Sequence, residues 1–180
     1  MSLDLCSINT TSALRDKRMS KCKVTANRYH DISVGHRVVG HEGKCRHLHG
    51  HNYRIHFFCE AAKLDELGRV IDFSVIKEKL CMWLETNWDH KFLAWEKDTL
   101  ICSLDSLMFQ NSDNPTANIK DEDNKFFNES IVWVDFNPTA ENLAEYLLNI
   151  IGPRQLAGTG VTLTKVIIEE TRKCSVTCEK

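Results

Sequence analysis

The chain has 180 residues, the usual size of a single domain, and its charge is nearly balanced, with 23 Lys and Arg against 25 Asp and Glu. This balance excludes the basic excess that binding to nucleic acid or to an anionic membrane surface requires. With only 3 Pro and 8 Gly, the composition also excludes a fibrous or largely disordered chain. We therefore expect one globular domain.

The compartment can be inferred from what the chain lacks. No apolar run approaches the ~20 residues that cross a bilayer, and the first twenty residues contain neither the basic nor the apolar region of a secretory signal. The eight Cys residues form no C-x-x-C pair of the redox or zinc-finger type. We expect a cytoplasmic protein with reduced thiols, without a membrane or nucleic-acid partner.

The apolar pattern predicts two strands in the first third of the chain. After an N-terminal extension over 1–26, which we expect to be mobile, the alternation of apolar residues up to His36 indicates a strand over about 22–36. Residues 49–60 alternate more clearly, with His49, His51 and Tyr53 on the same side. These strands begin a single catalytic domain, which we expect to span 27–180.

The rest of the chain predicts helices and further strands. Asp72 suits a helix N-cap, and helical spacing of apolar residues follows over about 73–86. An irregular piece over 87–95 and a long polar loop or partly ordered insertion over 97–130 follow. The last part of the chain predicts a strand over 131–136, a helix that begins near 137–139 and is stopped by Gly152-Pro153, and a strand over 161–173. Consecutive strands without crossover helices favour an antiparallel sheet with helices on one face, which is an α+β domain.

The densest chemical signal is the stretch G-K-C-R-H-L-H-G-H-N-Y over 43–53. On a strand, His49 and His51 share one face, with their backbones about 6.6 Å apart, so their imidazoles can converge on one ion. His36 can supply a third ligand if the two strands pair in antiparallel fashion. Three His ligands leave one tetrahedral position open, which is typical of a catalytic zinc site rather than a structural one.

The H-x-H pattern also occurs in proteins that have no such zinc site. An isolated H-x-H pair is common and needs no metal. A cupin would place a metal-binding carboxylate four or five residues after the second His, where this chain has Ile55 and His56. An amidohydrolase barrel requires about 250 residues, more than the chain has.

A series of motifs resembles the 6-pyruvoyltetrahydropterin synthase / 6-carboxytetrahydropterin synthase family. The motifs are His36, the C-x-x-x-H-G-H-N-Y stretch that begins at Cys45, Asp89-His90, the P-T-A-E segment 138–141, and Glu170-Thr171. The resemblance covers about 28–178 and is interrupted by the insertion. It implies the tunnelling fold (T-fold), a four-stranded antiparallel sheet with two helices on one face. Three copies of this fold close into a barrel, and two trimers commonly stack into a hexamer.

The resemblance also assigns roles to individual residues. It implies zinc on His36, His49 and His51, a catalytic thiol at Cys45 with Asp89 and His90 as its relay partners, and pterin contacts by Thr139, Glu141 and Glu170. Thr139 and Glu141 could equally serve as helix-start residues, or do both. Glu169 and Glu170 face opposite sides of their strand, and the Glu-Thr pattern selects Glu170 as the carboxylate that holds the ring.

The implied activity is that of a lyase acting on the carbon–carbon and carbon–oxygen bonds of a pterin triphosphate. Only three residues separate Cys45 from His49, which resembles the queuosine-route branch. We therefore expect a zinc-dependent 6-carboxy-5,6,7,8-tetrahydropterin synthase of queuosine or 7-deazaguanine biosynthesis. It would convert 7,8-dihydroneopterin triphosphate into 6-carboxytetrahydropterin, acetaldehyde and triphosphate. The alternatives are a 6-pyruvoyltetrahydropterin synthase of the biopterin route, a non-catalytic zinc- and pterin-binding protein, and a zinc hydrolase.

Overall fold

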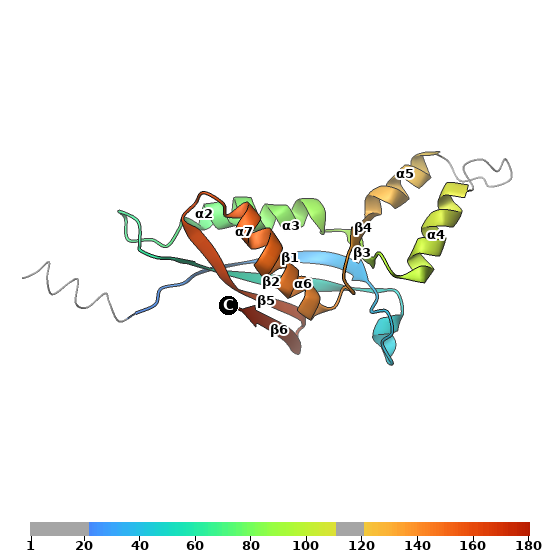
Figure 1. The fold of residues 1–180 in the computed structure, drawn as a ribbon, viewed down its shortest axis with the longest axis horizontal. Coiled ribbons are helices and arrows are strands. Elements are labelled where there is room, and N and C mark those ends of the chain that lie inside the picture. Colours follow the sequence, from blue (N-terminus) through green and yellow to red (C-terminus); the bar gives the residue numbers. More distant parts are fainter. Residues whose placement is uncertain (1–21, 111–120) are drawn as a thin grey trace, which may run out of the picture.

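The computed structural model describes residues 22–110 and 121–180. Most of the expected N-terminal extension (1–21) and the middle of the insertion (111–120) therefore lie outside the described residues. The described chain forms one mixed sheet of six strands with helices on one face (Figure 1). Within the part of the chain that is described, no helix combines the length and the apolar character needed to cross a membrane.

The sheet has the strand order β4-β3-β1-β2-β5-β6. Its strands are β1 (Ala26–His36), β2 (His49–Ala61), β3 (Lys91–Trp95), β4 (Ile131–Val134), β5 (Val161–Thr171) and β6 (Cys174–Glu179). The pairs β1–β2, β2–β5 and β5–β6 are antiparallel, whereas β3 runs parallel to both β1 and β4. The prediction of a four-stranded, wholly antiparallel sheet is therefore wrong in strand number and in the direction of two pairings.

Two strands were missed for identifiable reasons. The segment Lys91–Trp95 is only five residues long and follows a turn, so its pattern was too short to distinguish from an irregular piece. β6 is only six residues long and mostly exposed, so its alternation of Cys174, Val176 and Cys178 with polar residues was too short to be recognised as a strand. β4 joins the sheet beside β3 because the insertion carries the chain back between them, as a parallel pair requires.

The insertion is largely helical where it is described, contrary to the predicted loop. It contains α4 (Thr99–Gln110) and α5 (Asp121–Ser130), which project beyond β3 and β4 in Figure 1. The first amides of α4, those of Leu100 and Ile101, donate to the carboxylate of Asp98. Asp98 is almost fully buried and forms an ion pair with Arg37 at 3.0 Å, so a tertiary contact fixes the start of this helix.

Two longer helical segments cover the sheet. The first runs over 73–87 and consists of α2 (Phe73–Ile76), a wider π-helical turn η2 (Lys77–Cys81) and α3 (Met82–Asn87). It begins where expected, because the side chain of Asp72 accepts a hydrogen bond from the Ser74 amide at 2.8 Å. The prediction of a helix over 73–86 is confirmed.

The second segment runs over 140–155 and consists of α6 (Ala140–Tyr146), η4 (Leu147–Ile151) and α7 (Gly152–Gln155). Thr139 is its N-cap, with its side chain accepting from the Asn142 amide. Gly152 does not stop the helix as predicted. A Cβ atom at this position would lie 2.5 Å from Cδ2 of Leu163, so this glycine lets the helix approach β5 closely.

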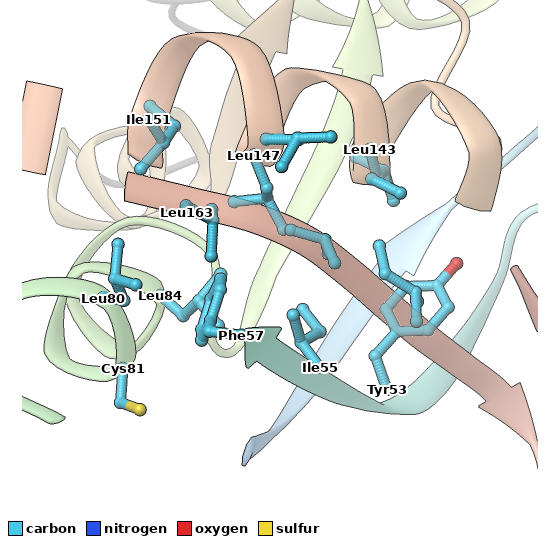
Figure 2. Packing of buried hydrophobic residues seen from close by; sticks show 14 of the residues in the cluster. Tyr53, Ile55, Phe57, Leu80, Cys81, Leu84, Leu143, Leu147, Ile151 and Leu163 are labelled. Carbon is cyan, nitrogen blue, oxygen red and sulfur yellow. The ribbon is translucent and has the colours of Figure 1, made fainter. Parts of the chain in front are cut away.

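The hydrophobic core lies between these two helical segments and the sheet. Figure 2 shows Tyr53, Ile55 and Phe57 of β2 on the strand side of the core, with Leu143 and Leu147 on the helix side, and all five belong to the same buried cluster. The alternation predicted for residues 49–60 is thus observed, because every second side chain of β2 from Tyr53 onward is buried in the core. The same side continues toward His51 and His49 at the start of the strand.

Candidate active site

Three imidazoles meet at the ends of β1 and β2. The antiparallel register places His36 opposite His49 and Val34 opposite His51, so all three histidines share one face. One ring nitrogen from each lies within 4.8 Å of the others. Gly50 between them is needed because a Cβ atom there would meet the carbonyl oxygen of Val34 at 2.9 Å. The structure therefore brings together the three predicted ligands.

The rings are oriented by hydrogen bonds to backbone carbonyls. Nδ1 of His36 donates to the Pro138 carbonyl at 2.7 Å, and Nδ1 of His49 donates to the His47 carbonyl at 2.8 Å. A carbonyl can only accept, so each of these rings carries its hydrogen on Nδ1 and presents the lone pair of Nε2 to the cluster. This is the arrangement of metal-ligating histidines.

The chemistry of the cluster fits a zinc ion. Nε2 of His49 and of His51 are buried without a hydrogen-bond partner. Burial is the main reason why the pKa values of His36 and His51 are lowered, which keeps both rings neutral at pH 7. Neutral imidazoles with free lone pairs are what a divalent cation requires, and three of them form the donor set of a catalytic zinc site.

Tyr53 extends this cluster toward a carboxylate. The residue is 1% exposed, and its hydroxyl lies 3.2 Å from Nε2 of His36 and 3.2 Å from Oε1 of Glu170. Burial, followed by the charge of Glu170, raises the pKa of Tyr53 far above its usual range, so the phenol stays protonated. The sequence analysis gave Tyr53 no role. Its position two residues after His51, on the same strand face, could have indicated that it lies beside the histidine cluster.

The structure separates the two adjacent glutamates at the end of β5. Oε1 of Glu170 lies 3.5 Å from Nε2 of His51, whereas Glu169 pairs with His56 at 2.7 Å. The register of the β5–β6 pair shifts between Glu169 and Thr171, which is typical of a β-bulge at the end of β5. Glu170, the glutamate that the Glu-Thr pattern selects as the ring anchor, is thus the one beside the histidine cluster.

A cavity of about 370 Å³, here called the thiol cavity, gathers most of the other predicted site residues. It is lined by Val38, His41, Cys45, Thr139, Ala140, Glu141, Glu170, Cys174, Ser175 and Val176. Cys45 reaches it from the short 3-10 turn η1 (Lys44–Arg46). Ligand pockets occupy about 300–1,000 Å³, so this volume can hold a bicyclic ring.

The loop that carries Cys45 is fastened by a residue that sequence reasoning missed. The side chain of Asn137 accepts from the Val39 amide at 3.0 Å and donates to the Val39 carbonyl at 2.9 Å. This two-way contact ties the loop after β1 to the segment that begins α6. Thr139 therefore acts both as the cap of α6 and as part of the wall of the thiol cavity.

Asp89 and His90 lie in a different place. They line a larger, more open cavity of about 800 Å³, here called the relay cavity, together with His51 of the histidine cluster, Asn52 and Glu169. Cys45 does not line it, although Glu170 borders both cavities. The structure of one chain does not unite the predicted relay pair with the predicted thiol.

The relay pair is held against the edge of β1. The Ser33 amide donates to Oδ1 of Asp89 at 2.8 Å, and the His90 amide donates to the Ser33 carbonyl at 2.8 Å. His90 has a φ of 56°, in the left-handed region, and its Nδ1 lies 2.7 Å from Oδ2 of Asp89. Burial raises the pKa of Asp89, but the hydrogen bonds from Ser33 and His90 outweigh it and leave this pKa below its ordinary value.

Comparison with known proteins agrees with these features. Residues 25–180 match the family model for 6-pyruvoyl tetrahydropterin synthase. A 6-carboxy-5,6,7,8-tetrahydropterin synthase of Rickettsia felis is 34% identical over 146 residues, which cover 81% of this chain and 93% of that protein. An enzyme of the same name from Rickettsia typhi is 32% identical over the same shares of both chains.

Solved structures share the fold. An uncharacterised protein of Wolinella succinogenes has a TM-score of 0.72 at 25% identity, over 88% of this chain and 99% of that chain. The 6-pyruvoyl tetrahydropterin synthase of Caenorhabditis elegans has a TM-score of 0.56 at 24% identity, over 88% of this chain and 96% of that chain. Because the family model matches most of its residues, the chain belongs to the 6-pyruvoyl tetrahydropterin synthase family.

Proposed function

We propose that the protein is a 6-carboxy-5,6,7,8-tetrahydropterin synthase. It would convert 7,8-dihydroneopterin triphosphate into 6-carboxytetrahydropterin, acetaldehyde and triphosphate, as a lyase of queuosine or other 7-deazaguanine biosynthesis. The relatives that match over most of the chain carry this name. The observation that carries the proposal is the convergence of three imidazole nitrogens beside a cavity lined by Cys45 and Glu170.

The residues divide the work of binding. His36, His49 and His51 would hold a zinc ion, which supplies a Lewis acid that polarises a hydroxyl of the substrate side chain. Glu170 would accept two parallel hydrogen bonds from the ring N–H and the exocyclic amine of the pterin. Thr139 and Glu141, which line the same cavity, would orient the ring.

Proton transfer falls to Cys45 and to the relay pair. Cys45 would remove a proton from the substrate side chain, and the hydrogen-bonded pair of Asp89 and His90 would return or accept one. Since one chain keeps Cys45 and His90 in different cavities, we assign the relay that serves each thiol to a second copy of the chain.

This assignment requires a homo-oligomer. Strands β4 and β6 form the two edges of the sheet, and pairing between such edges of neighbouring copies would close a barrel of three chains. Two trimers would stack into a hexamer. We place the enzyme in the cytoplasm, where the thiol of Cys45 stays reduced.

The test is incubation of the zinc-loaded protein with 7,8-dihydroneopterin triphosphate, with products identified by mass. We expect 6-carboxytetrahydropterin, acetaldehyde and triphosphate, and none of them with Cys45→Ala. The description of the family model favours one other outcome, 6-pyruvoyltetrahydropterin as the sole product, which would assign the chain to the biopterin branch. Unchanged substrate would leave a zinc- and pterin-binding protein.

A further inference from the structure

The hydroxyl of Tyr53 lies between two groups with separate roles. One is His36, an expected metal ligand, and the other is Glu170, the expected pterin anchor. Figure 2 shows the hydroxyl at the end of the Tyr53 ring, pointing away from Ile55 and Phe57. The ring therefore belongs to the core, while its polar end joins two parts of the site.

The hydroxyl has two acceptors and only one hydrogen to give. Nε2 of His36 presents a lone pair, because Nδ1 of the same ring donates to the Pro138 carbonyl. Oε1 of Glu170 is also an acceptor, and both lie 3.2 Å from the hydroxyl oxygen. Without a cation in the cluster, the two acceptors compete for the same hydrogen.

Binding of a cation would end this competition. Once the lone pair of His36 Nε2 is committed to a metal, the only acceptor left to the hydroxyl hydrogen, of these two, is Glu170. A hydrogen bond to a charged carboxylate is stronger than one between neutral groups and holds the acceptor in a defined orientation. Glu170 then presents its remaining lone pairs to the thiol cavity.

We propose that Tyr53 is a positioning residue that couples occupancy of the histidine cluster to the grip of Glu170 on the pterin ring. The proposal rests on the proposed function, since it takes the pterin ring as the ligand of Glu170. It makes the metal and the ring bind cooperatively without direct contact between them. By linkage, each would raise the affinity of the other by the same factor.

The experiment measures the affinity of pterin itself, the bicyclic ring without a side chain, for metal-free and zinc-loaded protein by calorimetry. Without side-chain hydroxyls, this probe lacks the groups through which the substrate would reach the metal. We expect zinc to tighten pterin binding about tenfold in the wild type, within the usual range of coupling between sites. In Tyr53→Phe, we expect the zinc effect to fall below about twofold, with zinc stoichiometry unchanged.

A matched control removes a hydroxyl elsewhere. Tyr146 packs against Trp88 and Phe136 on the helical side of the core and does not line the thiol cavity. Tyr146→Phe should keep the full zinc effect. If Tyr53→Phe also keeps it, the proposal is wrong, because the coupling then passes directly between the metal and Glu170 or the ring.

A second measurement does not depend on the folding of the Tyr53 variant. The infrared difference spectrum of the wild type with and without zinc should contain a shifted carboxylate band that is missing in Glu170→Gln. Absence of this band, or equal pterin affinity with and without zinc in the wild type, would contradict the coupling alone. Failure of zinc-loaded wild type to bind pterin at all would instead contradict the pterin site in the proposed function.

Discussion

The histidine cluster and the relay pair are the two chemical centres of this chain, and they are built in opposite ways. The cluster takes its three rings from facing positions of β1 and β2, so the register of one strand pair fixes it. Asp89 and His90 are neighbours in sequence, and they meet because His90 adopts a left-handed backbone conformation. A centre fixed by strand register is complete in one chain, whereas the relay pair lies apart from the thiol that it would serve.

Solvent exposure separates the two centres further. His36 is 1% exposed, and the cluster keeps two imidazole nitrogens buried without partners. Each buried, unpaired polar atom costs about 1–3 kcal/mol, which binding of a cation would recover. The side chain of His90 is 81% exposed and already paired with Asp89. The histidine cluster thus has free lone pairs for a cation, whereas the relay pair already has its hydrogen bond and is exposed enough to contact a neighbouring chain.

The largest expected effect comes from removing one ligand of the cluster. In His49→Ala, two imidazoles remain, and we expect zinc content measured by mass spectrometry to fall from one per chain to near zero. Turnover should fall with it. In Cys45→Ala, zinc should stay at one per chain while turnover drops about 10²–10⁴-fold, the usual contribution of an acid–base group. Zinc loss in the Cys45 variant would mean that the thiol is a ligand and not a base.

An intermediate effect tests whether the relay pair acts across chains. Cys45→Ala and His90→Ala should each be nearly inactive alone. After the two variants are unfolded together and refolded as mixed oligomers, about one quarter of the sites should pair an intact thiol with an intact relay. We therefore expect about a quarter of wild-type turnover. Mixed oligomers as inactive as their parents would show that each chain uses its own Asp89 and His90.

The smallest expected effect concerns the stability that Asp89 provides. Its pKa in the folded chain lies below the ordinary value of 3.8, so its contribution is present above that pH and is lost as the pH falls through the folded-state pKa. Asp89→Asn lacks this dependence. The urea midpoint of the metal-free variant should thus fall less between about pH 5 and about pH 3 than that of the wild type. His90→Gln, which removes one of the hydrogen bonds to Asp89, should give an intermediate slope, and identical slopes in all three proteins would contradict the assignment.

Prediction from sequence succeeded where a pattern was local. The period-two alternation over 49–60 and the cap at Asp72 placed β2 and the first helix correctly. It failed where a distant partner decides the structure. α4 begins directly after Asp98, whose buried pairing with Arg37 no local pattern reveals, and β3 exists because β1 and β4 flank it.

For the candidate site, too, local patterns could be predicted and distant contacts could not. Residue spacing was enough to propose that His49 and His51 share a strand face, and His36 could join them only if the two strands paired in antiparallel fashion, which the structure shows. Only the folded chain shows that Glu170 and not Glu169 lies beside them, that Tyr53 connects the two, and that Cys45 and His90 occupy different cavities. Those contacts depend on how strands, turns and helices that are distant in sequence pack against each other, and no short stretch of sequence contains that information.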